Sequence, residues 1–219
     1  MSLAERLTAL KEGNRSKMPE SSKKVMADDL LRLGESGIVE KAPKVGEKLA
    51  DFKLSNQKGE QVTLSDLRGK GPVVVTFYRG GWCPYCNLQL NAYQQILKDI
   101  KAEGATLVAI TPELPDASLS TSEKNDLQFE VLTDINSGYA EEIGIMFTVS
   151  EELIPVYESF GRHVEAHNGE GQYNVPLAST FIIDTDGVVT FAFVAVDYTY
   201  RAEPADIIKA LKSINGVTK

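Results

Sequence analysis

Apolar and polar positions along the chain predict a regular alternation of strands and helices. Residues 73–78 and 106–110 are apolar runs, as in strands that are buried on both faces of a sheet. Residues 86–101, between them, carry apolar side chains at helical spacing. The expected strands are residues 51–54, 61–64, 73–78, 106–110, 131–132, 179–183 and 188–194. The expected helices are residues 23–33, 86–101, 121–127, 137–143, 151–160 and 204–214.

The order of these elements predicts an α/β protein. A first hairpin is followed by alternating strands and helices, then by a second hairpin around residues 184–187 and a closing amphipathic helix. This order predicts a central mixed β-sheet with helices on both faces. We expect residues 1–44 to form an N-terminal helical extension and residues 45–219 to form the domain that contains the sheet.

Composition and charge narrow the classes of partner. The chain has 219 residues and a net charge of −8, which argues against nucleic acid and anionic membrane surfaces, because both attract basic faces. No apolar run approaches the roughly 18 residues that a membrane-spanning helix needs. Charged residues interrupt residues 1–17, unlike a secretory signal, so we expect a cytoplasmic protein.

The two cysteines of the chain, Cys83 and Cys86, stand where a buried strand meets a helix. Pro84 suits the first helical position, which makes Cys83 the N-cap beside unpaired N–H groups and the positive end of the helix dipole. This environment favours the thiolate, which is the reactive form of cysteine. A disulfide between the two sulfurs would close a small loop and add little stability, so the pair indicates reversible redox chemistry.

Zinc is the competing interpretation of the cysteine pair. A structural zinc site needs about four ligands, and the two histidines of the chain are His163 and His167. They lie far downstream of the cysteines, and no second cysteine pair exists. We therefore expect no metal and expect both histidines to be exposed loop residues, although a role for His167 in a substrate pocket stays open.

Residues 74–86, VVTFYRGGWCPYC, resemble the active-site strand and loop of the thioredoxin superfamily. Within it they resemble a peroxiredoxin-like branch of the alkyl hydroperoxide reductase and thiol-specific antioxidant (AhpC/TSA) family. Further similarity runs across most of the chain, at residues 45–52, 110–112, 180–187 and 197–204. The resemblance implies a thioredoxin-like fold and a thiol-dependent peroxidase that reduces hydrogen peroxide or alkyl hydroperoxides.

The peroxidatic motif of this family, Phe-Tyr-Pro-x-x-x-Thr-x-x-Cys, matches only in part. Its cysteine falls on Cys86, but Arg79 replaces the proline and Cys83 replaces the threonine. The arginine that the family carries before its third strand is replaced by Ala178. The thioredoxin pattern instead makes Cys83 the attacking thiol. Which sulfur attacks first stays open, as does the alternative of a protein disulfide oxidoreductase without significant peroxidase activity.

The resemblance gives each candidate catalytic residue a role. Cys83 and Cys86 would cycle between dithiol and disulfide through a sulfenic acid. Arg79 would be a positive neighbour of the thiolate and peroxide, and its alternative is a solvated loop arginine. Arg201 would reach the same site if residues 197–204 fold back, and its alternative is a surface ion pair.

The expected partners follow from the same resemblance. They are a peroxide and a thioredoxin-like, glutaredoxin-like or small-thiol reductant, and a homodimer is compatible with the family. No organic cofactor is implied, because the thiols carry the chemistry. Of the neighbouring aromatic residues, Trp82 either offers a packing surface to a partner or fills the core, and Tyr85 is expected at the surface.

Overall fold

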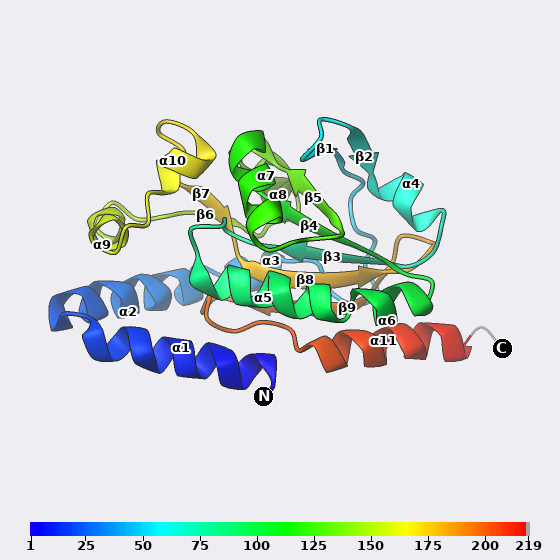
Figure 1. Ribbon diagram of the computed structural model, residues 1–219, viewed down its shortest axis with the longest axis horizontal. Helices are drawn as coiled ribbons and strands as arrows, with labels where there is room; N and C mark the ends of the chain where they lie inside the picture. The colour runs from blue at the N-terminus through cyan, green and yellow to red at the C-terminus, as the bar shows by residue number, and fades with distance from the viewer. Residues whose placement is uncertain (218–219) are drawn as a thin grey trace.

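The computed structural model describes residues 1–217 and is built on one seven-stranded sheet (Figure 1). The strands of this sheet are β1 (Lys53–Asn56), β2 (Gln61–Thr63), β3 (Val73–Phe77), β4 (Thr106–Thr111), β5 (Glu130–Thr133), β8 (Ala178–Ile183) and β9 (Val189–Ala195). Their order across the sheet is β2-β1-β5-β4-β3-β8-β9. The central strands β3, β4 and β5 are parallel, whereas β1, β2, β8 and β9 join by antiparallel pairing.

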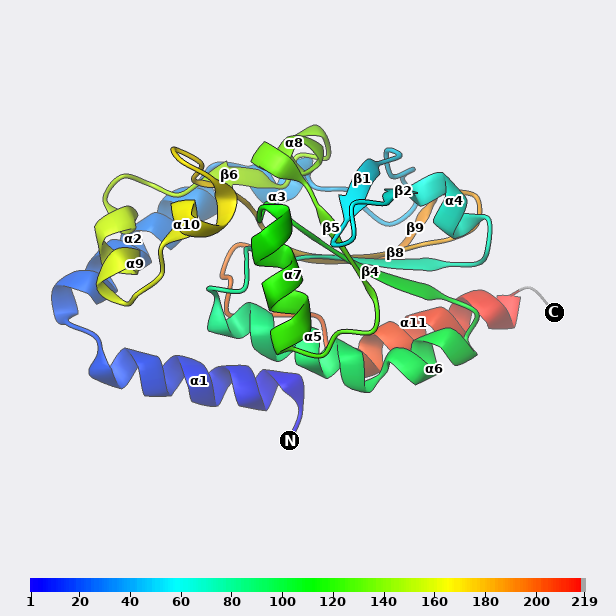
Figure 2. The same cartoon turned by 45° about the horizontal axis from the view of Figure 1, so that its top comes forward.

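Helices cover both faces of this sheet (Figures 1 and 2). They are α1 (Leu3–Lys17), α2 (Glu20–Glu35), α3 (Ile38–Lys41), α4 (Leu64–Arg68), α5 (Pro84–Gln95), α6 (Leu97–Ala102), α7 (Pro115–Lys124), α8 (Gly138–Glu142), α9 (Leu153–Ser159), α10 (Val164–Asn168) and α11 (Pro204–Val217), with a 3₁₀ turn, η1 (Ile135–Ser137). Apolar side chains of α1, α5, α6 and α11 form the core on one face. Those of α3, α4 and α8 form the core on the other. The predicted mixed sheet with flanking helices is therefore confirmed.

The sequence prediction is wrong about where one helix begins. Helix α7 starts at Pro115, whereas the apolar pattern predicts a start near residue 121. Pro115 stands at the beginning of the helix, where a missing N–H group leaves no hydrogen bond unmade. The inward positions of α7 are Ser118, Thr121 and Ser122, so the helix buries polar side chains and shows little of the apolar periodicity that marks a helix.

Two further differences concern short segments. The single helix expected at residues 86–101 is two helices, α5 and α6, which meet at Ile96 with φ −98° and ψ 7°. The strands β6 (Met146–Thr148) and β7 (Asn174–Pro176) form a separate two-stranded antiparallel sheet that was not expected. We call residues 146–176 the β6–β7 segment, and it also contains α9 and α10.

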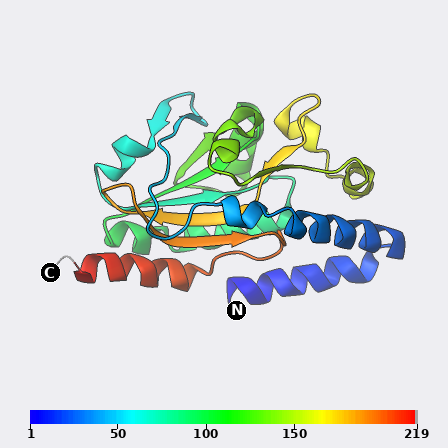
Figure 3. The same cartoon turned by 180° about the vertical axis from the view of Figure 1, so that it is seen from behind.

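The N-terminal helices lie against the sheet-containing domain. Helix α1 packs on α5, and α2 packs on α9. The backbone N–H of Leu3 donates to the Glu203 carboxylate, so the start of α1 lies beside the start of α11, as Figure 3 shows from behind. None of the helices in residues 1–217 combines the length and apolar character that a bilayer crossing requires. The last two residues of the predicted domain, 218 and 219, lie outside the described residues.

Candidate functional site

The two cysteines lie where strand β3 leads into helix α5. Cys83 is the N-cap of α5, with φ −93° and ψ 112°, and Pro84 takes the first helical position. The backbone N–H of Cys86 donates to the Cys83 carbonyl at 3.1 Å, so the two residues share the first helical turn. Both are free thiols with exposed fractions of 1% and 0%. A reactive pair at a helix N-terminus is therefore enclosed by protein.

Cys83 is in contact with a buried arginine. The Arg79 guanidinium donates from Nη2 to the Cys83 Sγ at 3.3 Å and from Nη1 to the Tyr157 hydroxyl at 2.8 Å. It lies 3.9 Å from the ring centre of Tyr198 and 5.0 Å from that of Trp82. Arg79 is only 2% exposed, so it is not a solvated loop residue. Aromatic faces attract such a cation without neutralising its charge.

Cys86 has an arginine of its own. Residues 197–204 fold back over α5, and Arg201 donates from Nη2 to the Cys86 Sγ at 3.2 Å. Its Nε donates to the Gln89 side-chain oxygen at 2.6 Å, and its Nη1 donates to the carbonyls of Tyr198 and Tyr200. Arg201 is 6% exposed and forms no surface ion pair with any of residues 1–217.

The two guanidinium groups lack carboxylate partners. Among residues 1–217, no Asp or Glu forms an ion pair with Arg79 or Arg201. A buried charge is costly unless an opposite charge or strong hydrogen bonds compensate it. The negative group available to both arginines is a thiolate of the cysteine pair, so the enclosure favours one ionised sulfur.

The negative charge falls on Cys83. Burial raises the pKa of its thiol, but the hydrogen bond with Cys86 and the positive charges of Arg79 and Arg201 outweigh burial and hold the pKa well below its ordinary value. Burial raises the pKa of Cys86, and the hydrogen bond to Cys83 and the charge of that thiolate raise it further, well above its ordinary value. These opposite shifts favour ionisation of Cys83 over ionisation of Cys86.

A buried polar network that the sequence pattern does not predict supports Arg201. Gln89, with no exposed surface, accepts from Arg201 and donates to the Thr76 hydroxyl at 2.8 Å. Thr76 pairs with the Thr180 hydroxyl at 2.8 Å, and Thr180 pairs with the Tyr93 hydroxyl at 3.2 Å. Polar residues at inward-facing positions of β3, α5 and β8 were the one available signal for this network.

Two expectations about neighbouring residues are corrected, those for Tyr85 and His167. Tyr85 is 4% exposed rather than on the surface, because α1 covers it and Asn14 donates to its hydroxyl at 3.3 Å. Trp82 is half-buried against Arg79 and Tyr157. His167 is not an exposed loop residue: it lies on α10 with 31% of its side chain exposed. No group of three or more metal-ligating side chains occurs within residues 1–217.

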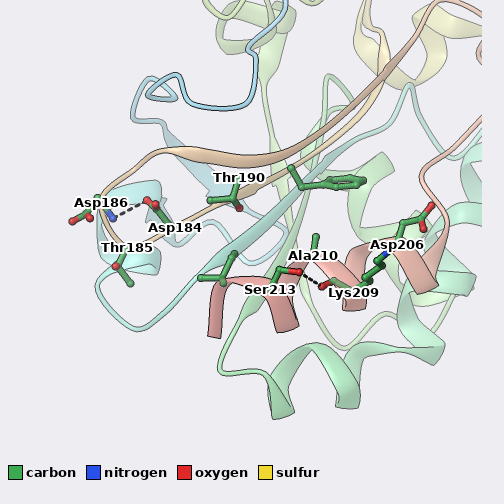
Figure 4. Close-up of a pocket in the computed structure, with 10 residues that line it drawn as sticks. Asp184, Thr185, Asp186, Thr190, Asp206, Lys209, Ala210 and Ser213 are labelled. Carbon is green, nitrogen blue, oxygen red and sulfur yellow. Dashed lines mark hydrogen bonds between the residues drawn. The ribbon is translucent and has the colours of Figure 1, made fainter. Parts of the chain in front are cut away.

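A large groove lies at the other end of the sheet from the cysteines. It is a groove of about 830 Å³ between the β8–β9 turn and α11 (Figure 4). Val73, at the start of β3, pairs with Ile183 beside that turn, whereas Cys83 follows the end of β3. A smaller cavity of about 130 Å³ lies between helices α1 and α2 and is also lined by Tyr85 and Tyr198.

Comparisons with known proteins agree with this architecture. The AhpC/TSA family model matches residues 45–192. A putative peroxiredoxin Bcp of Coxiella burnetii is 26% identical over 146 residues, which are 67% of this chain and 85% of that protein. Peroxiredoxin Bcp of Escherichia coli K12 is 30% identical over 102 residues, 47% of this chain and 65% of that protein.

Solved structures show the same fold. The crystal structure of peroxidoxin BcpB from Mycobacterium tuberculosis aligns with a TM-score of 0.62 at 22% identity, over 78% of this chain and 98% of that one. A reduced 2-Cys peroxiredoxin of Plasmodium vivax aligns with a TM-score of 0.61 at 16% identity, over 78% of this chain and 82% of that one. At these identities the likeness concerns the fold.

Proposed function

The chain belongs to the AhpC/TSA family and is a thiol-dependent peroxidase, and we propose that its reaction runs through Cys83 and Cys86. The observation that carries this proposal is the pair of buried arginines, one on each sulfur, with no carboxylate ion pair among residues 1–217. Such a pocket stabilises an anionic sulfur and the negative charge that develops on a peroxide. Hydrogen peroxide and alkyl hydroperoxides are the proposed substrates.

Cys83 attacks first in the proposed reaction. Its thiolate bonds to the terminal oxygen of the peroxide, the O–O bond breaks, and the alkoxide or hydroxide leaves and takes up a proton. Cys83 is then a sulfenic acid. The Arg79 guanidinium, 3.3 Å from the attacking sulfur, is placed to stabilise the leaving oxygen. The lowered pKa of Cys83 supports this order of attack, because it supplies the thiolate near neutral pH.

Cys86 resolves the sulfenic acid. Its sulfur bonds to that of Cys83, and the sulfenic hydroxyl leaves as water with the proton of the Cys86 thiol. Arg201, 3.2 Å from the Cys86 sulfur, favours the developing thiolate. A thioredoxin-like, glutaredoxin-like or small-thiol reductant then supplies two thiols, becomes a disulfide and restores the dithiol.

A direct role in disulfide exchange is the second candidate function. The observation that favours it is Cys83 itself, a lowered-pKa thiolate at a helix N-cap, which is the position of the attacking thiol in the thioredoxin pattern. Such a protein would exchange its disulfide with protein thiols and react slowly with peroxide. The two functions differ in one measurable quantity, the rate of the first oxidation.

Single-turnover oxidation separates these functions. Reduced protein is mixed with hydrogen peroxide in a stopped-flow instrument while the fluorescence of Trp82, the single tryptophan, is followed. Oxidation far faster than that of an ordinary free thiol supports the peroxidase, and a sulfenic acid trapped in Cys86→Ser but not in Cys83→Ser identifies the attacking sulfur. Oxidation at the rate of a free thiol contradicts the proposal and favours disulfide exchange.

Three further features belong to the proposal. A cytoplasmic location is proposed, because cytosolic reductants would keep a close cysteine pair available as thiols. A homodimer is proposed from the family alone. The division into an N-terminal extension at residues 1–44 and a domain from residue 45 is supported by the family model, which begins at residue 45.

A further inference from the structure

Glu113 is a buried carboxylate that the proposed reaction does not use. It lies two residues after the end of β4, at the edge of the sheet where β3 leads to the cysteines, and it has no exposed surface. Four groups from three parts of the chain converge on it: the Tyr78 hydroxyl at 3.1 Å, the Gly81 N–H at 2.8 Å, the Thr121 hydroxyl at 3.2 Å and His167 Nδ1 at 2.8 Å. A buried carboxylate with fewer partners would be costly, so this cluster fixes its members in place.

The Gly81 contact joins this carboxylate to the reactive loop. Gly81 lies between Arg79 and Cys83, and its backbone is pressed against α7: a Cβ atom added at Gly81 would lie 2.1 Å from the Thr121 hydroxyl oxygen. Gly80 has φ +144°, and a Cβ there would lie 2.4 Å from the Trp82 ring nitrogen. The loop therefore depends on two glycines and on a hydrogen bond to Glu113, because no side chain fits at either position.

His167 closes the cluster from the solvent side. His167 Nδ1 lies 2.8 Å from Glu113 Oε1, and an ionised carboxylate only accepts hydrogen bonds, so Nδ1 is the donor when Glu113 is ionised. The His167 carbonyl also accepts from the backbone N–H of Leu114 at 2.7 Å, which fixes α10 against the residue that follows Glu113. The β6–β7 segment thus reaches the reactive loop twice, through His167 to Glu113 and through Tyr157 to Arg79.

We infer that Glu113, held by His167, is a positioning residue that fixes the loop of residues 79–83 and thereby keeps the Arg79 guanidinium on the Cys83 sulfur. This role rests on the proposed function, because its effect on the reaction passes through Cys83. Without the carboxylate, the Gly81 N–H loses its acceptor in a buried site. The loop then shifts, the 3.3 Å contact between Arg79 and Cys83 weakens, and the thiolate loses stabilisation.

The test compares Glu113→Ala with Glu113→Gln. The thiolate is titrated by its ultraviolet absorbance, and the second-order rate of oxidation by hydrogen peroxide is measured at pH 7. Glu113→Ala should raise the pKa of the reactive thiol by about one unit and slow oxidation about tenfold. Glu113→Gln keeps an acceptor oxygen for the Gly81 N–H and should stay within about twofold of wild type.

The sign of the pKa change separates positioning from a simple charge effect. Removing a nearby negative charge lowers a thiol pKa, so a lowered pKa in Glu113→Ala overturns the inference. An unchanged pKa and rate also overturn it, as does a glutamine variant as impaired as the alanine variant. Glu123→Ala, which removes an exposed carboxylate from helix α7, is the matched control and should match wild type.

Variants of His167 provide a second test of the inference if circular dichroism shows that Glu113→Ala does not fold. His167→Asn keeps a donor near the position of Nδ1 and should behave as wild type, whereas His167→Ala should move the pKa and rate in the same direction as Glu113→Ala. Equal values for the two His167 variants contradict the inference. A wild-type protein with an ordinary thiol pKa and slow oxidation contradicts the proposed function instead, so the two failures are distinct.

Discussion

Each sulfur of the site has one buried arginine, but the two arginines reach their sulfurs by different routes. Arg79 stands four residues before Cys83, on the same loop, whereas Arg201 is 115 residues from Cys86 in sequence. Arg201 spreads its hydrogen bonds over Gln89 and two backbone carbonyls. Arg79 is surrounded by aromatic rings, and its Nε has no hydrogen-bond partner within the described chain.

Arg79 depends on a thiolate more than Arg201 does. Neutral acceptors hold most of the Arg201 donors whatever the state of Cys86. Arg79 has one neutral acceptor, the Tyr157 hydroxyl, so much of its compensation comes from the Cys83 sulfur. We therefore expect Arg79 to control the ionisation and first oxidation of Cys83, and Arg201 to act mainly on the resolving step at Cys86.

The largest expected effects come from replacing each of the two cysteines by serine. Cys83→Ser should abolish peroxide turnover, because the serine hydroxyl is not ionised near neutral pH. Cys86→Ser should keep the first oxidation but stop at the sulfenic acid, because no thiol remains to resolve it. Steady-state peroxide consumption with a dithiol donor and trapping of the sulfenic acid measure both. Full turnover in either variant would contradict the assigned roles.

A second test replaces each of the two arginines by glutamine in turn. Arg79→Gln should raise the pKa of Cys83, so the rate of oxidation, which increases as the thiolate forms, should rise at higher pH than in wild type. At pH 7 an ordinary thiol is only a few per cent ionised, so less of the variant carries the reactive thiolate. The more basic thiolate is also more nucleophilic, which offsets part of this deficit, and we expect the rate of oxidation to fall about tenfold. Arg201→Gln should alter this first step less and slow the formation of the disulfide more. Equal pH–rate profiles for the two variants would remove the distinction between the arginines.

Stability of the reduced protein should depend on pH through Cys83. Its pKa is lowered in the folded state, so the unfolded chain binds more protons between that pKa and about 8.5, and stability rises with pH there. The contribution is lost as the pH falls through the pKa of the folded protein. Denaturant unfolding should show the free energy of unfolding of wild type rising relative to Cys83→Ser, by up to about 1.4 kcal/mol per pH unit. A gap that stays constant with pH would contradict a lowered pKa.

The smallest expected effects concern the groups that hold the arginines. Tyr157→Phe removes the one neutral acceptor of Arg79, and we expect a change of about threefold in the first oxidation. Gln89→Met removes the acceptor of Arg201 Nε and should affect the resolving step by a similar factor. Stopped-flow traces resolve the two steps. If each variant changes a different step, Arg79 and Arg201 act on separate steps of the reaction. If both variants change the same step, that division of roles is wrong.

The local part of the site was predictable from the sequence. The apolar run before the cysteines, Pro84 at the first helical position and the N-cap position of Cys83 depend on residues close together in the chain. Strand β3 and the start of α5 therefore follow from short-range rules. Arg79 could be named for the same reason, since four residues separate it from Cys83.

The identity of the groups around that local motif needed the tertiary structure. Ala178 leaves the family position of an arginine empty, and only the folding of residues 197–204 over α5 brings Arg201 to Cys86. Tyr85 is buried because α1, distant in sequence, covers it. Glu113 and His167 lie 54 residues apart and carry no shared pattern.

Short-range patterns in the sequence predict the reactive cysteine pair, its position at the start of a helix and the alternation of strands and helices. The tertiary structure decided which charges face the sulfurs, that both sulfurs are enclosed, and that a buried carboxylate anchors the reactive loop. The physical reason is the separation along the chain of the residues that interact. Helix caps and strand periodicity are set by neighbours in the chain, whereas burial and pKa depend on every group that folding brings within a few ångströms.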